Sequence, residues 1–407
     1  MGYYPLPPLS ILRGGFWWEL KLLEREGFGM FDYGIEIKPR WNHGFWGKLR
    51  WTVGLECIQW PYLRRLDDIL KRNMWKKESR YDRGLLLTVT VTDNCPYECE
   101  HCFEEACPTG ANFLNIRRVD EVADEAARLN DGRYYLPTIV RITGGDPFRH
   151  PEIFHIIRSF AERKEALGID CIDVETNGWW ATNDEKTAEI ILKTREAGAN
   201  DISFTVDHWH AKQQTFPLLE HTQRIWDVAG KLGLRRTNDF KIRCIVNMPS
   251  VTGSSYDYGG EIEVTQVTPI GRAMNLLEKY WYKKGGYESC RLCPPTQAEV
   301  FGRWVQYEEI TIGPNGNVYF CNSGKQFQHA TLAIGNIYEE SLDHIVNNNH
   351  NPLVRILRKK GVRGLANCLK RRIPMRKYWH LYDKFGPCGL CHNLLRNHGK
   401  EIMERIK

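Results

Sequence analysis

The stretch Cys95-Pro-Tyr-Glu-Cys99-Glu-His-Cys102 places three cysteines on a short segment, directly after an apolar run from Leu85 to Thr92. The run alternates aliphatic residues with threonine, which is typical of a β-strand. Three thiolates this close on a loop can bind three irons of a [4Fe–4S] cube and leave its fourth iron open. Because an open iron can bind a small molecule and pass it an electron, the spacing predicts radical chemistry at the end of a strand.

The length of 407 residues allows a catalytic domain and one or two smaller modules. The sequence contains no apolar run of about eighteen residues, as a transmembrane helix would need. Residues 1–10 also lack the charged and apolar regions of a secretory signal. We therefore expect a cytoplasmic protein, with attachment to the periphery of a membrane as the alternative.

Thirteen cysteines in a chain without a secretory signal argue against a disulfide framework. Scattered buried thiols behave as small apolar side chains, which accounts for Cys57, Cys171 and Cys244. The cysteines at or near metal-ligand spacings are Cys95, Cys99, Cys102, Cys290, Cys293, Cys321, Cys368, Cys388 and Cys391. Their clustering favours metal sites over scattered core thiols.

The pattern divides the chain into a tryptophan-rich extension (1–84), a region of alternating strands and helices (85–275) and a separate cysteine-bearing domain (276–407). Strands are predicted at 85–92, 138–143, 171–176, 201–206, 241–247 and 262–268, and helices at 119–129, 152–166, 185–197 and 218–232. Six successive β/α units imply a parallel sheet with helices outside, either open or as a partial (β/α)6 barrel. A hairpin is expected over 310–320.

One face of the predicted strands is polar, although parallel strands that are covered on both sides are normally apolar. Asp173 and Glu175 share a face of the third strand, and Ser203, Thr205 and Asp207 alternate with apolar residues along the fourth. A polar inner face predicts an interior that holds a polar ligand.

The first cysteine group resembles the signature of the radical S-adenosylmethionine (SAM) enzymes, C-x3-C-x-Φ-C, with His101 at the usually aromatic position. Other segments resemble motifs of that family in the same order: Thr143-Gly-Gly-Asp-Pro147 its GGEP-like turn, Glu175-Thr-Asn-Gly178 its TNG strand end, and Thr205-Val-Asp207 its S-x-D segment. Asp146 stands where Glu is more usual. The resemblance implies an α/β fold, a partial TIM-type barrel with an N-terminal extension and a C-terminal cysteine-rich domain.

The same resemblance implies a [4Fe–4S] cluster on Cys95, Cys99 and Cys102, with SAM bound to its open iron. Glycine permits close backbone approach to SAM, and Asp146 offers an anion to the SAM ammonium group. The implied SAM-binding residues are Gly144, Gly145, Asp146, Pro147, Glu175, Asn177, Thr205, Asp207, Asn247, Arg272 and His101. Reductive cleavage of SAM would give a 5′-deoxyadenosyl radical that abstracts hydrogen from a substrate.

The later cysteines resemble the auxiliary-cluster domains of this family, called SPASM in the long form and Twitch in the short form. Gly316-x4-Cys321 and Cys388-x2-Cys391 match, whereas the C-x2-C-x5-C-x3-C run of a full SPASM domain is absent. We expect one auxiliary [4Fe–4S] cluster, with two as an alternative. Its candidate ligands are Cys321, Cys388, Cys391 and one of Cys290 or Cys293, with Cys368 as a further candidate. A zinc site on the same thiolates is the competing interpretation.

No catalytic side chain stands out from the sequence. Cys107 is a weak candidate for donating a hydrogen atom to a product radical. His208 and His210 follow the fourth strand at the expected barrel mouth, where a histidine can orient substrate or move protons. A spectator thiol and solvated loop histidines are the competing interpretations.

Basic residues crowd the C-terminal region, since residues 344–380 contain no Asp or Glu but many Lys and Arg. Such a block indicates either an anionic partner or a solvated face. A helix predicted over 61–76 either packs on the main domain or meets a membrane or an amphiphilic substrate. We expect an organic substrate, with an anionic one as a variant, and an external electron donor of the flavodoxin or ferredoxin type. A peptide or a membrane surface is a further candidate partner, and no nucleic acid is expected.

The first functional hypothesis is an oxidoreductase-type radical SAM enzyme that acts on an organic substrate, with the auxiliary cluster assisting oxidation or binding. The alternatives are a maturase of ribosomal peptides, an enzyme that acts on an anionic lipid or glycolipid, and a non-enzymatic metal-binding scaffold. The sequence leaves the substrate and the net reaction open.

Overall fold

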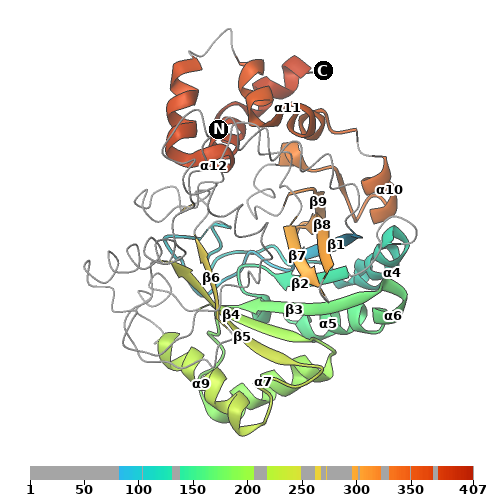
Figure 1. The fold of residues 1–407 in the computed structure, drawn as a ribbon, viewed down its shortest axis with the longest axis vertical. Coiled ribbons are helices and arrows are strands. Elements are labelled where there is room, and N and C mark those ends of the chain that lie inside the picture. The colour runs from blue at the N-terminus through green and yellow to red at the C-terminus, as the bar shows by residue number, and fades with distance from the viewer. Residues whose placement is uncertain are drawn as a thin grey trace, which may run out of the picture.

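The computed structural model describes residues 82–102, 104–130, 138–205, 218–248, 262–266, 272, 296–300, 303–321, 330–348, 350–369 and 375–406. Nearly all of the tryptophan-rich extension, including the helix expected over 61–76, lies outside these residues. Figure 1 shows a twisted sheet in the middle of the molecule, with helices along one side and the C-terminal helices beyond one end.

Six parallel strands form the centre of the sheet, in the order in which they follow along the chain. They are β1 (Asp82–Thr90), β2 (Thr138–Thr143), β3 (Ile169–Thr176), β4 (Asp201–Thr205), β5 (Lys241–Met248) and β6 (Ile262–Gln266). Every neighbouring pair among them is parallel. Among the described residues β6 pairs with no strand but β5, so the sheet stays open. This confirms the six predicted strands and the partial-barrel fold class.

Helices between the strands cover the apolar face of the sheet. They are α4 (Val119–Asn130), α5 (Ile153–Ala161), α6 (Lys164–Leu167), α7 (Asp184–Glu196) and α9 (Leu218–Lys231), with the short turns η1 (Ile116–Arg118) and η2 (Pro147–Arg149). Val89, Val140 and Val174 of the first three strands bury against Ile156 and Phe160 of α5 in one core cluster. The alternation predicted from the sequence thus separates an apolar outer face from a polar inner one.

The C-terminal region adds four strands and three helices to the described part of the chain. These are β7 (Thr296–Val300), β8 (Arg303–Ile312), β9 (Asn317–Tyr319), β10 (Gly335–Asn336), α10 (Leu342–Asn347), α11 (Pro352–Cys368) and α12 (Met375–Ile406), with the turn η6 (Ala330–Leu332) before β10. The β8–β9 hairpin confirms the predicted turn over 310–320. No described helix is long and apolar enough to cross a membrane.

The pairing of β8 with β1 was not expected from the sequence. The two strands run parallel from Asp82 opposite Val305 to Val89 opposite Ile312. The sheet therefore continues from the barrel into the C-terminal region, which was predicted to be a separate domain. As a result, the strand that leads into Cys95 is hydrogen-bonded on both sides, by β2 and by β8.

Candidate functional site

The side chain of Asn94 holds the loop after β1 in place near the start of that loop. The Asn94 side chain donates to the carbonyl oxygens of Pro108 (3.0 Å) and Gly110 (2.7 Å) and accepts from Arg149 Nε at 2.7 Å. The backbone N–H of the next residue, Cys95, donates to Cys107 O at 3.0 Å. The loop is therefore closed on itself before the cysteine group begins.

The three cysteines of this loop are close enough to influence one another. Cys95 and Cys99 are buried, and Cys102 is partly buried. Burial raises the pKa of the Cys95 thiol, and the charges of Asp146, Cys99 and Cys102 raise that pKa further. Three thiolates in this setting need a cation to stabilise them, which suits iron, because soft sulfur ligands bind iron–sulfur clusters.

The turn after β2 packs on the backbone of the cysteine loop. Gly145 N donates to Thr92 O at 2.7 Å, and Asp146 N donates to Asn94 O at 2.9 Å. A Cβ atom added to Gly145 would lie 2.4 Å from Asn94 O, and one added to Gly144 would lie 2.6 Å from Thr92 O. Only glycine permits this approach, so the two motifs form one unit.

The Asp146 carboxylate is completely buried and accepts four hydrogen bonds from the chain. Oδ2 accepts from Thr176 Oγ1 (2.7 Å) and Asn177 N (2.9 Å), and Oδ1 accepts from Phe148 N (3.0 Å) and Trp179 Nε1 (3.2 Å). Burial raises the pKa of Asp146 to about 6, while these hydrogen bonds act to lower it. The resemblance implies that this carboxylate faces the SAM ammonium group. In the structure both oxygens hold the turns after β2 and β3 together.

Arg272 also serves the cysteine loop. Its Nε donates to Cys99 O at 2.9 Å, its Nη2 to Ala106 O at 2.7 Å, and its backbone N to Cys102 O at 3.2 Å. The resemblance implies that this residue binds SAM. The observed contacts show a guanidinium that fixes the loop, a role that the sequence could not reveal.

The inner face of the sheet carries a network of charges, as predicted. Arg243 pairs with Asp173 (2.8 Å) and Asp201 (3.1 Å), and Arg141 pairs with Glu175 (2.9 Å). Coulombic attraction to Glu175, the largest cause, raises the pKa of Arg141. Glu175, an expected SAM-binding residue, thus has Arg141 as an ion-pair partner.

Two buried hydroxyls on the same inner face have no hydrogen-bond partner among the described residues. Thr88 and Thr90 of β1 are 2% and 1% exposed, and their Oγ1 atoms are unpaired there. Buried polar atoms are normally satisfied, so these hydroxyls favour an interior that holds a polar ligand or water.

Some of the remaining expected site residues lie within the described part of the structure, and others lie outside it. His101 is buried, Pro147 opens η2, Thr205 ends β4, and Asn247 lies in β5 opposite Thr265 of β6. Asp207, His208, His210, Cys290 and Cys293 lie outside the described residues. The Cys107 sulfur lies 3.3 Å from Thr109 Oγ1, at the surface of the cysteine loop.

The C-terminal cysteines lie on different elements. Cys321 directly follows the β8–β9 hairpin, Cys368 ends α11 with its thiol donating to Gly364 O at 3.3 Å, and Cys388 and Cys391 lie in α12. Gly386 (φ 66°) breaks the regular geometry of α12 just before them. In the described part of the chain no three Cys, His, Asp or Glu side chains converge on one metal ion. A cubane spreads its ligand sulfurs more widely than one tetrahedral ion does.

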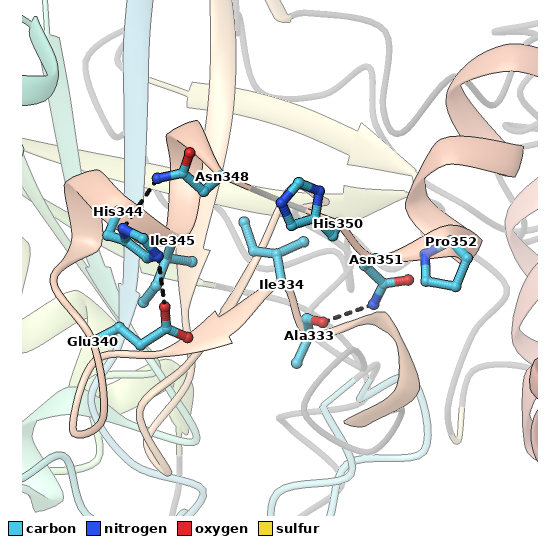
Figure 2. A pocket seen from close by; sticks show the side chains of 9 residues that line it. All are labelled: Ala333, Ile334, Glu340, His344, Ile345, Asn348, His350, Asn351 and Pro352. Atoms are coloured by element: carbon cyan, nitrogen blue, oxygen red, sulfur yellow. Dashed lines mark hydrogen bonds and ion pairs between the residues drawn. The ribbon is translucent and has the colours of Figure 1, made fainter. Parts of the chain in front are cut away.

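A cavity of about 560 Å³ lies between η6, α10 and the start of α11, away from the expected site residues (Figure 2). His344 contacts Glu340 (3.4 Å) and Asn348 (3.0 Å), while Asn351 donates to Ala333 O at 2.7 Å. These polar groups on the cavity wall bond within the chain, and their contacts stabilise the loops around the cavity.

Comparison with known families agrees with this arrangement. Residues 89–255 match the model of the radical SAM superfamily, and residues 304–370 match SPASM, an iron–sulfur cluster-binding domain. The first range contains the cysteine loop and the turns after β2 and β3. The chain belongs to the radical SAM superfamily and is a radical SAM enzyme with a C-terminal SPASM domain.

Individual relatives are distant. The chain is 22% identical over 324 residues to "Putative peptide biosynthesis protein YydG" of Bacillus subtilis (strain 168). The alignment covers 76% of this chain and 92% of that protein. It is 27% identical over 135 residues to a GTP 3′,8-cyclase of Vibrio cholerae serotype O1, spanning only 36% of the cyclase.

Two solved structures also align with most of this chain at low sequence identity. "Native anSMEcpe with bound AdoMet and Cp18Cys peptide" aligns with a TM-score of 0.44 at 12% identity, over 79% of this chain and 98% of that one. Streptococcus suis SuiB bound to the precursor peptide SuiA aligns with a TM-score of 0.37 at 14% identity, over 86% of this chain and 80% of that one.

Proposed function

We propose that this radical SAM enzyme abstracts hydrogen from a residue of a peptide substrate. The observation that carries the radical chemistry is the buried cysteine loop, closed by Asn94, packed on Gly145 and held by Arg272. The observation that favours a peptide is the similarity to the B. subtilis peptide biosynthesis protein, which extends over 92% of that protein.

In this proposal Cys95, Cys99 and Cys102 hold the SAM-binding [4Fe–4S] cluster. The bound cluster supplies the electron that cleaves SAM to methionine and the 5′-deoxyadenosyl radical. Gly144 and Gly145 let the turn after β2 pack closely on the backbone of the cysteine loop. The loop contacts keep the three thiols in place, so their geometry does not depend on the substrate.

The inner face of the barrel would receive the reacting part of the peptide. Arg141, Glu175 and Arg243 provide fixed charges there, and the hydroxyls of Thr88 and Thr90 provide hydrogen-bonding groups. A polar but enclosed interior orients a substrate group and excludes water and stray hydrogen donors.

The C-terminal region would hold the auxiliary cluster. Cys321, Cys388 and Cys391, with Cys290 or Cys293, are the proposed ligands, and Cys368 is a further candidate. This cluster would bind the substrate or accept an electron from its radical. An external flavodoxin or ferredoxin would reduce the SAM-binding cluster.

The experiment uses the full chain, reconstituted with iron and sulfide without oxygen and reduced by dithionite. We expect 5′-deoxyadenosine to form from SAM, and no 5′-deoxyadenosine above background would contradict the radical function. Peptides encoded by short reading frames beside the gene are then supplied with deuterium at carbon. Transfer of deuterium into 5′-deoxyadenosine identifies a substrate, whereas transfer only from small metabolites would overturn the peptide assignment.

A further inference from the structure

A hydrogen bond to sulfur connects the turn after β3 with the cysteine loop after β1. The Asn177 side-chain amide donates to Cys95 Sγ at 3.4 Å. Asn177 is 5% exposed and Cys95 is 6% exposed, so water does not compete well for either group. The residue that the resemblance assigns to SAM binding therefore has a direct contact with an expected cluster ligand.

The orientation of this amide is fixed by its other end. Asn177 Oδ1 accepts from Trp179 N at 3.0 Å, so the NH2 group is the end that faces the sulfur. An amide whose oxygen is already paired with a backbone N–H cannot turn over without losing that hydrogen bond.

Asp146 anchors the same turn at three residues. Its carboxylate accepts from the Thr176 hydroxyl, from Asn177 N and from Trp179 Nε1. Because the carboxylate is completely buried and bonded within the chain, it holds the Asn177 backbone N–H and the side chains of Thr176 and Trp179 on either side of it. Asp146 thus acts on Cys95 through Asn177.

We propose that Asn177, positioned by Asp146, donates a hydrogen bond to the Cys95 ligand sulfur and thereby raises the reduction potential of the SAM-binding cluster. This rests on the proposed function, which places that cluster on Cys95. Ligand sulfurs carry more negative charge in the reduced cluster, so an N–H donor stabilises the reduced form more than the oxidised form.

The Asn177 amide lies where it can offset a nearby negative charge. The completely buried Asp146 carboxylate accepts from the backbone N–H of Asn177, whose side chain contacts Cys95 Sγ, and a negative charge so near the ligand sulfur opposes addition of an electron to the cluster. The Asn177 amide, on the turn after β3, donates to the sulfur and offsets part of this cost. Asn177 and Asp146 are positioning residues in this proposal.

The test is a redox titration of the reconstituted full chain, followed by electron paramagnetic resonance. The SAM-binding cluster is recognised as the signal that changes when SAM is added. In Asn177→Ala we expect the midpoint potential of this signal to fall by about 59 mV, a tenfold change in the one-electron equilibrium constant. The matched control is Asn183→Ala, which removes the cap of α7 (Asn183 Oδ1 to Lys186 N, 2.8 Å) and leaves the midpoint unchanged.

A double-mutant cycle tests the part of Asp146. If Asp146 positions the amide, Asn177→Ala shifts the midpoint less than a third as much in an Asp146→Ala background as in the wild type. Should Asp146→Ala not take up iron, Trp179→Phe replaces it, because it removes the Nε1 donor and keeps the ring. Equal shifts in both backgrounds would overturn the positioning role.

Two outcomes separate this proposal from the proposed function. An unchanged midpoint in Asn177→Ala, with weaker SAM binding by calorimetry, would overturn this proposal alone, because Asn177 would then act on SAM. A wild-type chain with no SAM-responsive cluster signal would overturn the proposed function and this proposal together.

Discussion

The cysteine loop after β1 and the cysteines of the C-terminal region are held in different ways. Cys95, Cys99 and Cys102 share one short loop, which the turns after β2 and β3 and the side chain of Arg272 fix in place. The described C-terminal cysteines come instead from a hairpin and two helices. The first ligand set already lies on one loop, which distant contacts only hold in place, whereas the dispersed set is brought together only when a hairpin and two helices have folded. The two regions should therefore respond differently to substitution.

The largest expected effect separates the two cysteine groups by function. Substitution of Cys95, Cys99 or Cys102 by Ala should reduce 5′-deoxyadenosine formation to background, because each change removes a ligand of the SAM-binding cluster. Cys388→Ala should leave SAM cleavage detectable while peptide product is lost. Chromatographic assay of both products checks this. Full SAM cleavage by Cys99→Ala would contradict the different roles of the two cysteine groups.

The next effect compares two arginines that each bond to a carbonyl oxygen at a cysteine. Arg272→Lys removes the fork that reaches Cys99 O and Ala106 O and should weaken cluster retention by about 10-fold or more. Arg405→Lys affects exposed contacts with Cys368 O and Glu401 and should change cluster retention little. Iron retained during dialysis against a chelator measures both. Equal loss from the two variants would contradict the stronger hold on the first loop.

A smaller effect compares one glycine from each region. Gly145→Ala forces a methyl group to within 2.4 Å of Asn94 O, and such overpacking costs about 1–3 kcal/mol of the free energy of unfolding. Gly399→Ala in α12 meets only ordinary contacts with Thr331, at 3.8 Å and beyond, and should stabilise by up to about 1 kcal/mol because alanine favours helix. Urea unfolding of each variant measures the difference. A stable, iron-replete Gly145→Ala would refute the close packing.

The smallest effect is a pH dependence in the barrel. His150 is buried, with Nε2 bonded to Leu114 O (2.9 Å) and Nδ1 accepting from Glu152 N (3.1 Å), and burial lowers its pKa below 6.5. The folded state therefore binds fewer protons than the unfolded state, and its stability falls as the pH drops below about 6.5. His150→Gln should flatten this slope in unfolding experiments between about pH 7 and pH 5. The exposed C-terminal His344, changed to Gln, is the matched control, and an equal slope in His150→Gln and wild type would contradict the assignment.

The strands and the first cysteine group could be predicted because their signals are local. Alternation along β1 to β6 reflects one apolar and one polar face, and the spacing of Cys95, Cys99 and Cys102 lies within one loop. Asp173 and Glu175 were expected on the inner face for the same reason, and their ion pairs with Arg243 and Arg141 lie there.

The contacts that could not be predicted join residues far apart in the chain. Arg272 bonds to Cys99 O across 173 positions, and Thr176 bonds to Asp146 across 30. The pairing of β8 with β1 depends on a sheet edge that no local pattern identifies. Hydrogen-bond partners of this kind depend on the tertiary fold, so the sequence could not show what each expected site residue contacts.

The most direct test of the central claim is electron paramagnetic resonance of the reconstituted, dithionite-reduced chain, recorded with and without SAM. We predict that the wild-type chain gives a [4Fe–4S] signal that changes on addition of SAM. In Cys99→Ala this signal should be absent, while a second signal, from the C-terminal region, should remain. A SAM-responsive signal that persists in Cys99→Ala, or that is absent from the wild type, would contradict this claim.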